Sequence, residues 1–306
     1  MKRDFLTVSE LSSKEIARLL KRAMAFKSGK DAHACPLIGK SIGLIFEKAS
    51  TRTRVSFEVG IYQLGAQSIY LTPKEIQIGR GETVHDTAKV LSRYLDAIVM
   101  RTFSHDTITE FASHASIPVI NGLSDLHHPC QALADVMTII EKKGRLNGIR
   151  LAYVGDGNNV ANSLIEAASI TGVSLTIACP GGYEPTVEIL DRARSLSKHE
   201  VTIVRDPKKA VSGADAVYTD VWVSMGQEKE ALQRKKKFRK YQLNKALLSH
   251  ARADAIVLHC LPAHRGEEIT DDVIDGRQSV VYDQAENRLH TQKALLEFLL
   301  ANEHSS

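Results

Sequence analysis

The segment Ser50-Thr51-Arg52-Thr53-Arg54 stands between an apolar run at residues 41–46 and a helical pattern at residues 55–64. The apolar run, Ser-Ile-Gly-Leu-Ile-Phe, predicts a buried strand, because short apolar runs suit a strand that is covered on both faces. The segment therefore marks a junction between a strand and a helix. Repetition of such junctions along a chain is typical of α/β proteins.

This junction also predicts a phosphate site. The first turn of a helix has unpaired N–H groups and the positive end of the helix dipole, and both attract phosphate. Arg52 adds a fork of donors that matches phosphate oxygens. The chain lacks the G-x-x-x-x-G-K-[ST] pattern of nucleotide-hydrolysing proteins, so the motif indicates a small phosphate-bearing ligand.

The helix after the junction has apolar residues on two faces. Val55, Val59 and Tyr62 lie on one face of the pattern, and Phe57, Ile61 and Leu64 lie on another. We therefore expect a helix that is buried on both faces and holds its N-terminus rigidly.

Short apolar runs alternate with helical patterns along the whole chain. Strands are expected at residues 41–46, 67–71, 97–100, 118–120, 151–154, 174–178, 201–204, 216–219, 256–259 and 280–282. A regular alternation of apolar strands and helices predicts parallel sheets covered by helices.

A polar break at residues 142–148 divides this alternation, and 306 residues suit two domains. We expect a first domain at residues 1–145, on which a C-terminal helix at 287–306 packs, and a second domain at residues 146–286. The fold class is α/β, with two doubly wound domains that each have a central, mainly parallel sheet flanked by helices. Ligands of such sheets usually bind at the carboxyl ends of the strands, so the active site is expected in the interdomain cleft.

Composition restricts the class of protein. The chain has 43% hydrophobic and 25% charged residues and a net charge of +4, which suits a globular protein and an anionic small substrate. Its four cysteines form no C-x-x-C pair, which favours a reducing, cytoplasmic setting. No apolar run is long enough to predict a membrane span, and the N-terminus lacks the apolar run of a signal peptide.

Three further segments follow predicted strands and carry polar or nucleophilic side chains. They are Asp125-Leu126-His127-His128-Pro129-Cys130-Gln131, Thr219-Asp220-Val221-Trp222-Val223-Ser224-Met225-Gly226 and His259-Cys260-Leu261-Pro262. A histidine and an amide could donate to a carbonyl oxygen, an aspartate could pair with an ammonium group, and a strand could deliver a cysteine to the cleft. Each segment alone also fits a loop, a strand end or a buried cysteine.

Two other segments, and the spacing of the histidines and cysteines, argue against other classes of protein. Gly155-Asp156-Gly157-Asn158-Asn159-Val160 imitates a dinucleotide fingerprint, but it lacks the third glycine and the acidic residue about 20 positions later, so no nicotinamide cofactor is expected. Asn158 and Asn159, at a helix start, could instead hold a carboxylate. The histidines and cysteines have no regular ligand spacing, so no metal is expected. The basic run 234–240 is expected to be a solvated surface, so no nucleic acid is expected.

Five motifs in order resemble the transcarbamylase family over nearly the whole chain. They are S-T-R-T-R, H-P-C-Q, G-D-G-N-N, D-x-W-x-S-M-G and H-C-L-P. The first two are similar to the carbamoyl-phosphate half that all transcarbamylases share, and the last two are similar to the members that use ornithine. The resemblance implies transfer of a carbamoyl group from carbamoyl phosphate to the δ-amine of L-ornithine, with no cofactor, as in arginine biosynthesis or, in reverse, arginine breakdown.

The resemblance also implies a role for individual residues. The catalytic residues would be Arg101, His128 and Cys260. Carbamoyl phosphate would be bound by Ser50, Thr51, Arg52, Thr53, Gln77, Arg101, His128, Gln131, Cys260, Leu261 and Arg288. Ornithine would be bound by Asn159, Asp220, Ser224 and Met225. The family implies a homotrimer, or a multiple of trimers, in which Gln77 serves a neighbouring subunit.

Several alternatives stay open from the sequence. Aspartate, putrescine or acetylornithine could be the acceptor. Outside enzymes, the rivals are a non-catalytic amino-acid-binding protein and a nucleic-acid-binding protein. An alkyl amine has a pKa of about 10.4, so only roughly one molecule in a few thousand is neutral at pH 7 and able to attack. A dry site would lower that pKa, and either Cys260 or a phosphate oxygen could take the proton.

Overall fold

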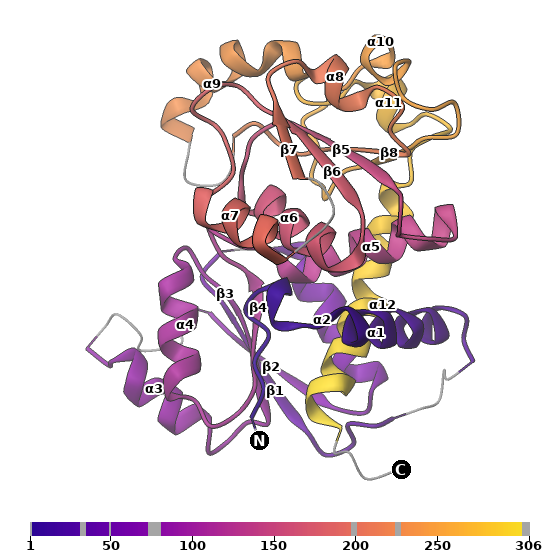
Figure 1. Ribbon diagram of the computed structural model, residues 1–306. Coiled ribbons are helices and arrows are strands. Elements are labelled where there is room, and N and C mark those ends of the chain that lie inside the picture. Colours follow the sequence, from indigo (N-terminus) through magenta and orange to yellow (C-terminus); the bar gives the residue numbers. More distant parts are fainter. Residues whose placement is uncertain are drawn as a thin grey trace. The chain divides into compact units, whose positions relative to one another are not determined.

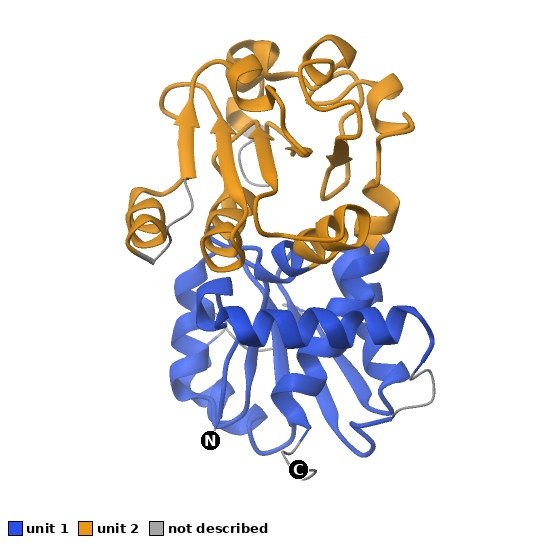
Figure 2. Ribbon diagram, turned by 45° about the vertical axis from the view of Figure 1, so that its right-hand side comes forward, with its two compact units in different colours: residues 1–133, 286–306 blue, residues 134–285 orange. Residues whose placement is uncertain are grey.

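The computed structural model describes residues 2–30, 35–48, 50–72, 81–196, 201–223 and 228–301 (Figure 1). The chain divides into two compact units, residues 1–133 with 286–306 and residues 134–285 (Figure 2). The limits expected from the polar break, residues 145 and 286, stay predictions. Among the described residues, no helix is both long and apolar enough to cross a membrane.

The first unit contains a four-stranded sheet in the order β2-β1-β3-β4. Its strands are β1 (Ser41–Phe46), β2 (Gln67–Leu71), β3 (Ala97–Arg101) and β4 (Val119–Leu123), and every pairing is parallel. Its helices are η1 (Val8–Glu10), α1 (Ser13–Lys27), α2 (Thr51–Gln63), α3 (Val84–Leu91), α4 (His105–His114), the start of α5 (Pro129–Lys143) and most of α12 (Val281–Leu300). The strand order reverses between β1 and β3, and ligands of such sheets bind where this happens.

The second unit contains a five-stranded parallel sheet in the order β7-β6-β5-β8-β9. Its strands are β5 (Arg150–Val154), β6 (Ser174–Ala178), β7 (Val201–Val204), β8 (Ala216–Thr219) and β9 (Ile256–Leu258). Its helices include α6 (Asn159–Thr171), α7 (Val187–Leu196), α8 (Pro207–Val211), η2 (Glu228–Glu230), α9 (Ala231–Phe238), η3 (Arg239–Tyr241), α10 (Lys245–Leu248) and α11 (Asp271–Ile274). Here the order reverses between β5 and β8. The predicted α/β class with two parallel sheets flanked by helices is confirmed.

The strand expected at residues 280–282 is wrong. The chain makes one isolated bridge there, between Ser279 and Val257, and then enters α12 at Val281. The Val280 N–H donates to the Val257 carbonyl at 3.0 Å, so pairing with the sheet ends after one residue. Val280 and Val281 are both buried, and the apolar pair that suggested a strand is buried at the start of a helix instead.

The helix α2 is buried on one face only, which corrects the expectation of two buried faces. Phe57 and Ile61 are fully buried. On the other face Val55 is 49% exposed, Val59 37% and Tyr62 80%. An apolar pattern predicts that a face is covered, but it does not say whether the same chain covers it.

Candidate active site

The phosphate motif lies at the start of α2, as the sequence predicts. Ser50 is the N-cap: its backbone is extended, and its hydroxyl accepts a hydrogen bond from the Thr53 N–H at 3.2 Å. Ser is favoured at this position because its side chain pairs one of the free N–H groups of the first turn. Thr51 and Arg52 are exposed in that turn, whereas Thr53 is buried. The motif therefore combines a helix N-terminus with an accessible guanidinium.

Two arginines that the resemblance assigns to the site meet at the Thr53 hydroxyl. Arg101, the last residue of β3, approaches it with Nη1 at 3.4 Å. Arg288 of α12 donates from Nη2 to the same hydroxyl at 3.1 Å and from Nη1 to Gln131 Oε1 at 2.7 Å. Because both arginines are buried, their guanidinium groups are held in fixed positions beside the start of α2. All four residues belong to the first unit.

His128 lies in the same positively charged surroundings. It is buried, and burial holds its pKa well below its ordinary value of 6.5. The charges of Arg288, Arg101 and Arg52 lower the pKa further. The imidazole is therefore neutral at neutral pH, and a neutral imidazole can donate one hydrogen bond to a carbonyl oxygen without adding charge. The three arginines supply the positive charge that a phosphate dianion needs.

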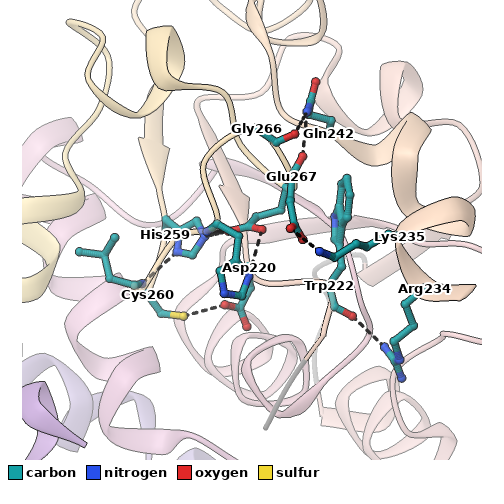
Figure 3. Close-up of polar contacts among 12 residues, drawn as sticks. Asp220, Trp222, Arg234, Lys235, Gln242, His259, Cys260, Gly266 and Glu267 are labelled. Carbon is teal, nitrogen blue, oxygen red and sulfur yellow. Dashed lines mark hydrogen bonds and ion pairs between the residues drawn. The ribbon is translucent and has the colours of Figure 1, made fainter. Parts of the chain in front are cut away.

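The second unit brings Asp220 and Cys260 together. Asp220 follows β8 and is buried, and its Oδ1 accepts a hydrogen bond from Cys260 Sγ at 2.9 Å (Figure 3). Its Oδ2 accepts from the side chain of Asn158 at 2.7 Å. Both carboxylate oxygens thus accept hydrogen bonds, one from Cys260 and one from Asn158, and these bonds fix the orientation of the Asp220 side chain.

Asn158, which the sequence places with Asn159 at a helix start where the two could hold a carboxylate, is not among the residues assigned to ornithine. It is the N-cap of α6, where its Oδ1 accepts from the Val160 and Ala161 N–H groups at 2.9 and 3.2 Å. Its amide nitrogen is thereby turned toward Asp220. An Asn just before a helical pattern was the available signal, because Asn is a preferred cap. The predicted ligand Asn159 is the next residue, the first of α6.

The H-C-L-P segment is supported by a buried histidine–glutamate pair that sequence reasoning missed. His259 Nδ1 accepts from the Leu261 N–H at 2.9 Å, which assigns the ring proton to Nε2, and Nε2 lies 3.1 Å from Glu268 Oε1 (Figure 3). The His259 N–H donates to Gln284 Oε1 at 2.9 Å. His259 and Glu268 are almost completely buried. These contacts hold Leu261, whose φ of 57° is left-handed, and so fix the path of the chain beside Cys260.

Two groups in the described part of the chain could hold a metal ion by proximity of their ligand atoms. They are Asp220, His259 and Cys260, and His264, Glu267 and Glu268. In the first group the thiol is bonded to the carboxylate and both imidazole nitrogens have protein partners. The possible ligand atoms of the first group are thus already engaged in hydrogen bonds within the protein.

The structure does not place all of the predicted site residues beside their expected neighbours. Gln77, Ser224 and Met225 lie outside the described residues. Cys260 and Leu261 belong to the second unit, so their part in binding carbamoyl phosphate stays a prediction. The basic run 234–240 is only partly a solvated surface, because Arg234 is buried.

Comparisons with known proteins give one family for both units. Residues 3–141 match the model "Aspartate/ornithine carbamoyltransferase, carbamoyl-P binding domain", and residues 147–299 match "Aspartate/ornithine carbamoyltransferase, Asp/Orn binding domain". The chain is 56% identical over 302 residues to the ornithine carbamoyltransferase of Syntrophus aciditrophicus, with 98% of this chain and 100% of the relative covered.

Solved structures agree with this match. The ornithine carbamoyltransferase of Pyrococcus furiosus is similar with a TM-score of 0.94 and 50% identity, covering 99% of this chain and 98% of that chain. The anabolic ornithine carbamoyltransferase of Campylobacter jejuni is similar with a TM-score of 0.93 and 40% identity, covering 98% and 99% of the two chains.

Proposed function

Since this chain belongs to the aspartate/ornithine carbamoyltransferase family, we propose that its two groups of site residues serve one reaction. The activity is ornithine carbamoyltransferase: the carbamoyl group of carbamoyl phosphate passes to the δ-amine of L-ornithine, giving L-citrulline and phosphate. The observation that carries the assignment of residues is the meeting of Arg101 and Arg288 at Thr53, in the first turn of α2.

The residues of the first unit suit carbamoyl phosphate. We assign the phosphate to the start of α2, with Ser50, Thr51, Arg52, Thr53 and Arg101 as its ligands. The carbamoyl carbonyl is assigned to neutral His128 and to Arg101, and Gln131, held by Arg288, is assigned to the carbamoyl amide. Donors that are fixed before the substrate arrives stabilise charge developing on the carbonyl and on the leaving phosphate.

The residues of the second unit suit the amino acid. Asp220 is assigned to the α-ammonium group of ornithine, because its carboxylate is buried and its orientation is fixed by Asn158. Asn159, Ser224 and Met225 are assigned to the other contacts of the amino-acid head group. Cys260 is assigned a place beside the δ-amine, and its thiol is oriented by Asp220.

The acceptor specificity is tested by measuring carbamoyl transfer to ornithine, putrescine, acetylornithine and aspartate. Citrulline formation from ornithine is expected to have by far the highest kcat/KM. Arg52→Ala is expected to lower kcat/KM for carbamoyl phosphate by about 10- to 100-fold, because a charged hydrogen bond contributes about 1.5–3 kcal/mol. Arg54→Gln is the matched control, since Arg54 pairs with Glu58 on the exposed side of the same helix. A preferred acceptor other than ornithine would contradict the assignment.

We also propose a homotrimer, in which Gln77 would reach a neighbouring site. The support is the apolar face of α2 formed by Val55, Val59 and Tyr62, which the described part of this chain leaves exposed. Sedimentation velocity is expected to show a trimer or a multiple of it, and Tyr62→Glu is expected to weaken the assembly. A wild-type monomer at micromolar concentration would contradict the proposal.

We propose further that the enzyme acts in arginine biosynthesis and in the cytoplasm. The similar Campylobacter jejuni enzyme is an anabolic one. All four cysteines, Cys35, Cys130, Cys179 and Cys260, are free thiols, which fits a reducing compartment.

A further inference from the structure

The helix α9 does more than form a basic surface. Lys235, Lys236 and Lys237 are exposed on it, but Arg234 is only 7% exposed. A buried guanidinium is unfavourable unless its donors are paired, so its partners show what it holds.

Arg234 connects two loops of the second unit. Its Nη1 donates to Asp156 Oδ2 at 2.8 Å, in the loop after β5. The same nitrogen donates to the Trp222 carbonyl at 3.0 Å, in the loop after β8 (Figure 3). Its Nε lies 3.2 Å from Glu230 Oε2, one turn earlier in the chain, which orients the guanidinium. The strands β5 and β8 are hydrogen-bonded neighbours, so one side chain bridges the ends of adjacent strands.

Both loops carry parts of the proposed ornithine site. Asp156 precedes Asn158 by two residues, and Trp222 follows Asp220 by two residues. Asn158 and Asp220 are bonded to each other at 2.7 Å. The Arg234 contacts therefore connect the two loops that carry the Asn158–Asp220 pair, each at a point two residues from that pair.

Lys235 of α9 and Gln242, just after η3, contact the loop that follows His259-Cys260-Leu261-Pro262. Lys235 Nζ lies 2.5 Å from Glu267 Oε1, and Gln242 Nε2 donates to the Gly266 and Glu267 carbonyls at 2.8 and 2.9 Å (Figure 3). Glu267 is adjacent to Glu268, the partner of His259. The Trp222 ring is also stacked on Phe238, the last residue of α9, with ring centroids 6.1 Å apart.

The charge of Arg234 matters as well as its shape. Burial raises the pKa of Asp156 to about 6, and the Arg234 charge opposes this effect. The negative charge of Asp220 acts in the same direction as burial. Without Arg234, the Asp156 carboxylate would lose its counterion close to Asp220, and the loop would have to rearrange.

We propose that Arg234 is a positioning residue for ornithine: by tying the loop at Asp156 to the carbonyl of Trp222, it keeps Asp220 and Asn158 in the geometry that receives the α-ammonium group. This inference rests on the proposed function, because it takes Asp220 as the ammonium ligand. Arg234 itself does not touch the substrate. Its effect is therefore expected in ornithine binding and not in carbamoyl phosphate binding.

The test compares Arg234→Gln, Arg234→Lys and Lys236→Gln in steady-state citrulline assays. Arg234→Gln is expected to raise the KM for ornithine by about 10- to 100-fold, the scale that a misplacement of roughly 1 Å produces. The KM for carbamoyl phosphate is expected to stay at the wild-type value. Arg234→Lys keeps the charge but not the two-armed fork, so partial rescue is expected. Lys236→Gln removes one charge from the exposed side of the same helix and is expected to behave as wild type.

A double variant keeps the test decisive if a lone buried carboxylate prevents folding. Arg234→Gln with Asp156→Asn removes both charges, and it is still expected to raise the KM for ornithine because the tie to Trp222 is lost. Folding is checked by circular dichroism. An unchanged KM for ornithine in a folded variant, or an equal rise for both substrates, would overturn the inference. A wild-type enzyme that forms no citrulline would instead overturn the proposed function.

Discussion

Replacing Arg101 by methionine is expected to lower kcat for citrulline formation by about two to three orders of magnitude, the usual effect of removing one donor from an oxyanion site. Arg101 ends β3 at a point where the pairing with β4 changes register, and it is buried beside Thr53. Its guanidinium is therefore fixed before substrate binds. Methionine has similar length and no charge, so the variant removes the donors and retains most of the packing.

Two further variants separate the effect of the Arg101 side chain from a nonspecific loss of activity. Arg101→Lys retains the charge without the planar fork and is expected to fall between wild type and Arg101→Met. Arg93→Met, at an exposed position shortly before β3, is the control. Because the Arg101 charge contributes to the low pKa of His128, the His128 pKa in Arg101→Met is expected to rise, which NMR titration can measure. A kcat equal to that of wild type would remove Arg101 from the catalytic residues.

Replacing Asp220 by asparagine is expected to raise the KM for ornithine by about 100- to 1000-fold. Removing one partner of a buried charge pair costs roughly 2–5 kcal/mol, and the α-ammonium group would lose that partner. Asparagine has the same shape, but its amide nitrogen must face a donor, either Asn158 Nδ2 or the Cys260 thiol. The variant therefore loses both the charge and one of the two contacts that orient residue 220.

The measurement is a pair of KM values, one for each substrate. Carbamoyl phosphate binding is expected to be unchanged, because the residues assigned to its phosphate belong to the first unit. Asp191→Asn on the exposed surface of α7 is the control, since the Asp191 carboxylate forms an exposed ion pair with its helical neighbour Arg194. If the KM for ornithine stayed near the wild-type value, Asp220 would not be the ammonium ligand.

Local signals in the sequence predicted the strands and helices that carry the site residues, and they predicted where the first site helix begins. The apolar run at residues 41–46 is β1, and Ser50 is the N-cap of the helix that follows, as the S-T-R-T-R pattern indicates. These predictions depend on neighbours in the chain, because strand burial and helix capping are short-range properties. The ordered motifs added the family, which the comparisons then gave independently.

Long-range packing explains two of the errors. Val280 and Val281 have the composition of a strand, but β9 offers only one bridging residue, so the chain enters a helix. Arg234 lies in a run of basic residues, yet Asp156, 78 positions away, makes its burial favourable. No local pattern contains that information, since the partner is supplied by a different loop.

The sequence by itself thus determined the α/β class, the strand-to-helix junction to which we assign the phosphate, and the family that the motifs resemble. Only the tertiary structure decided which side chains meet: Thr53 with Arg288, 235 positions apart, Asn158 with Asp220, and His259 with Glu268. The physical reason is that a cap or a strand depends on adjacent residues, whereas a buried charge or hydrogen bond requires a partner that only folding brings near.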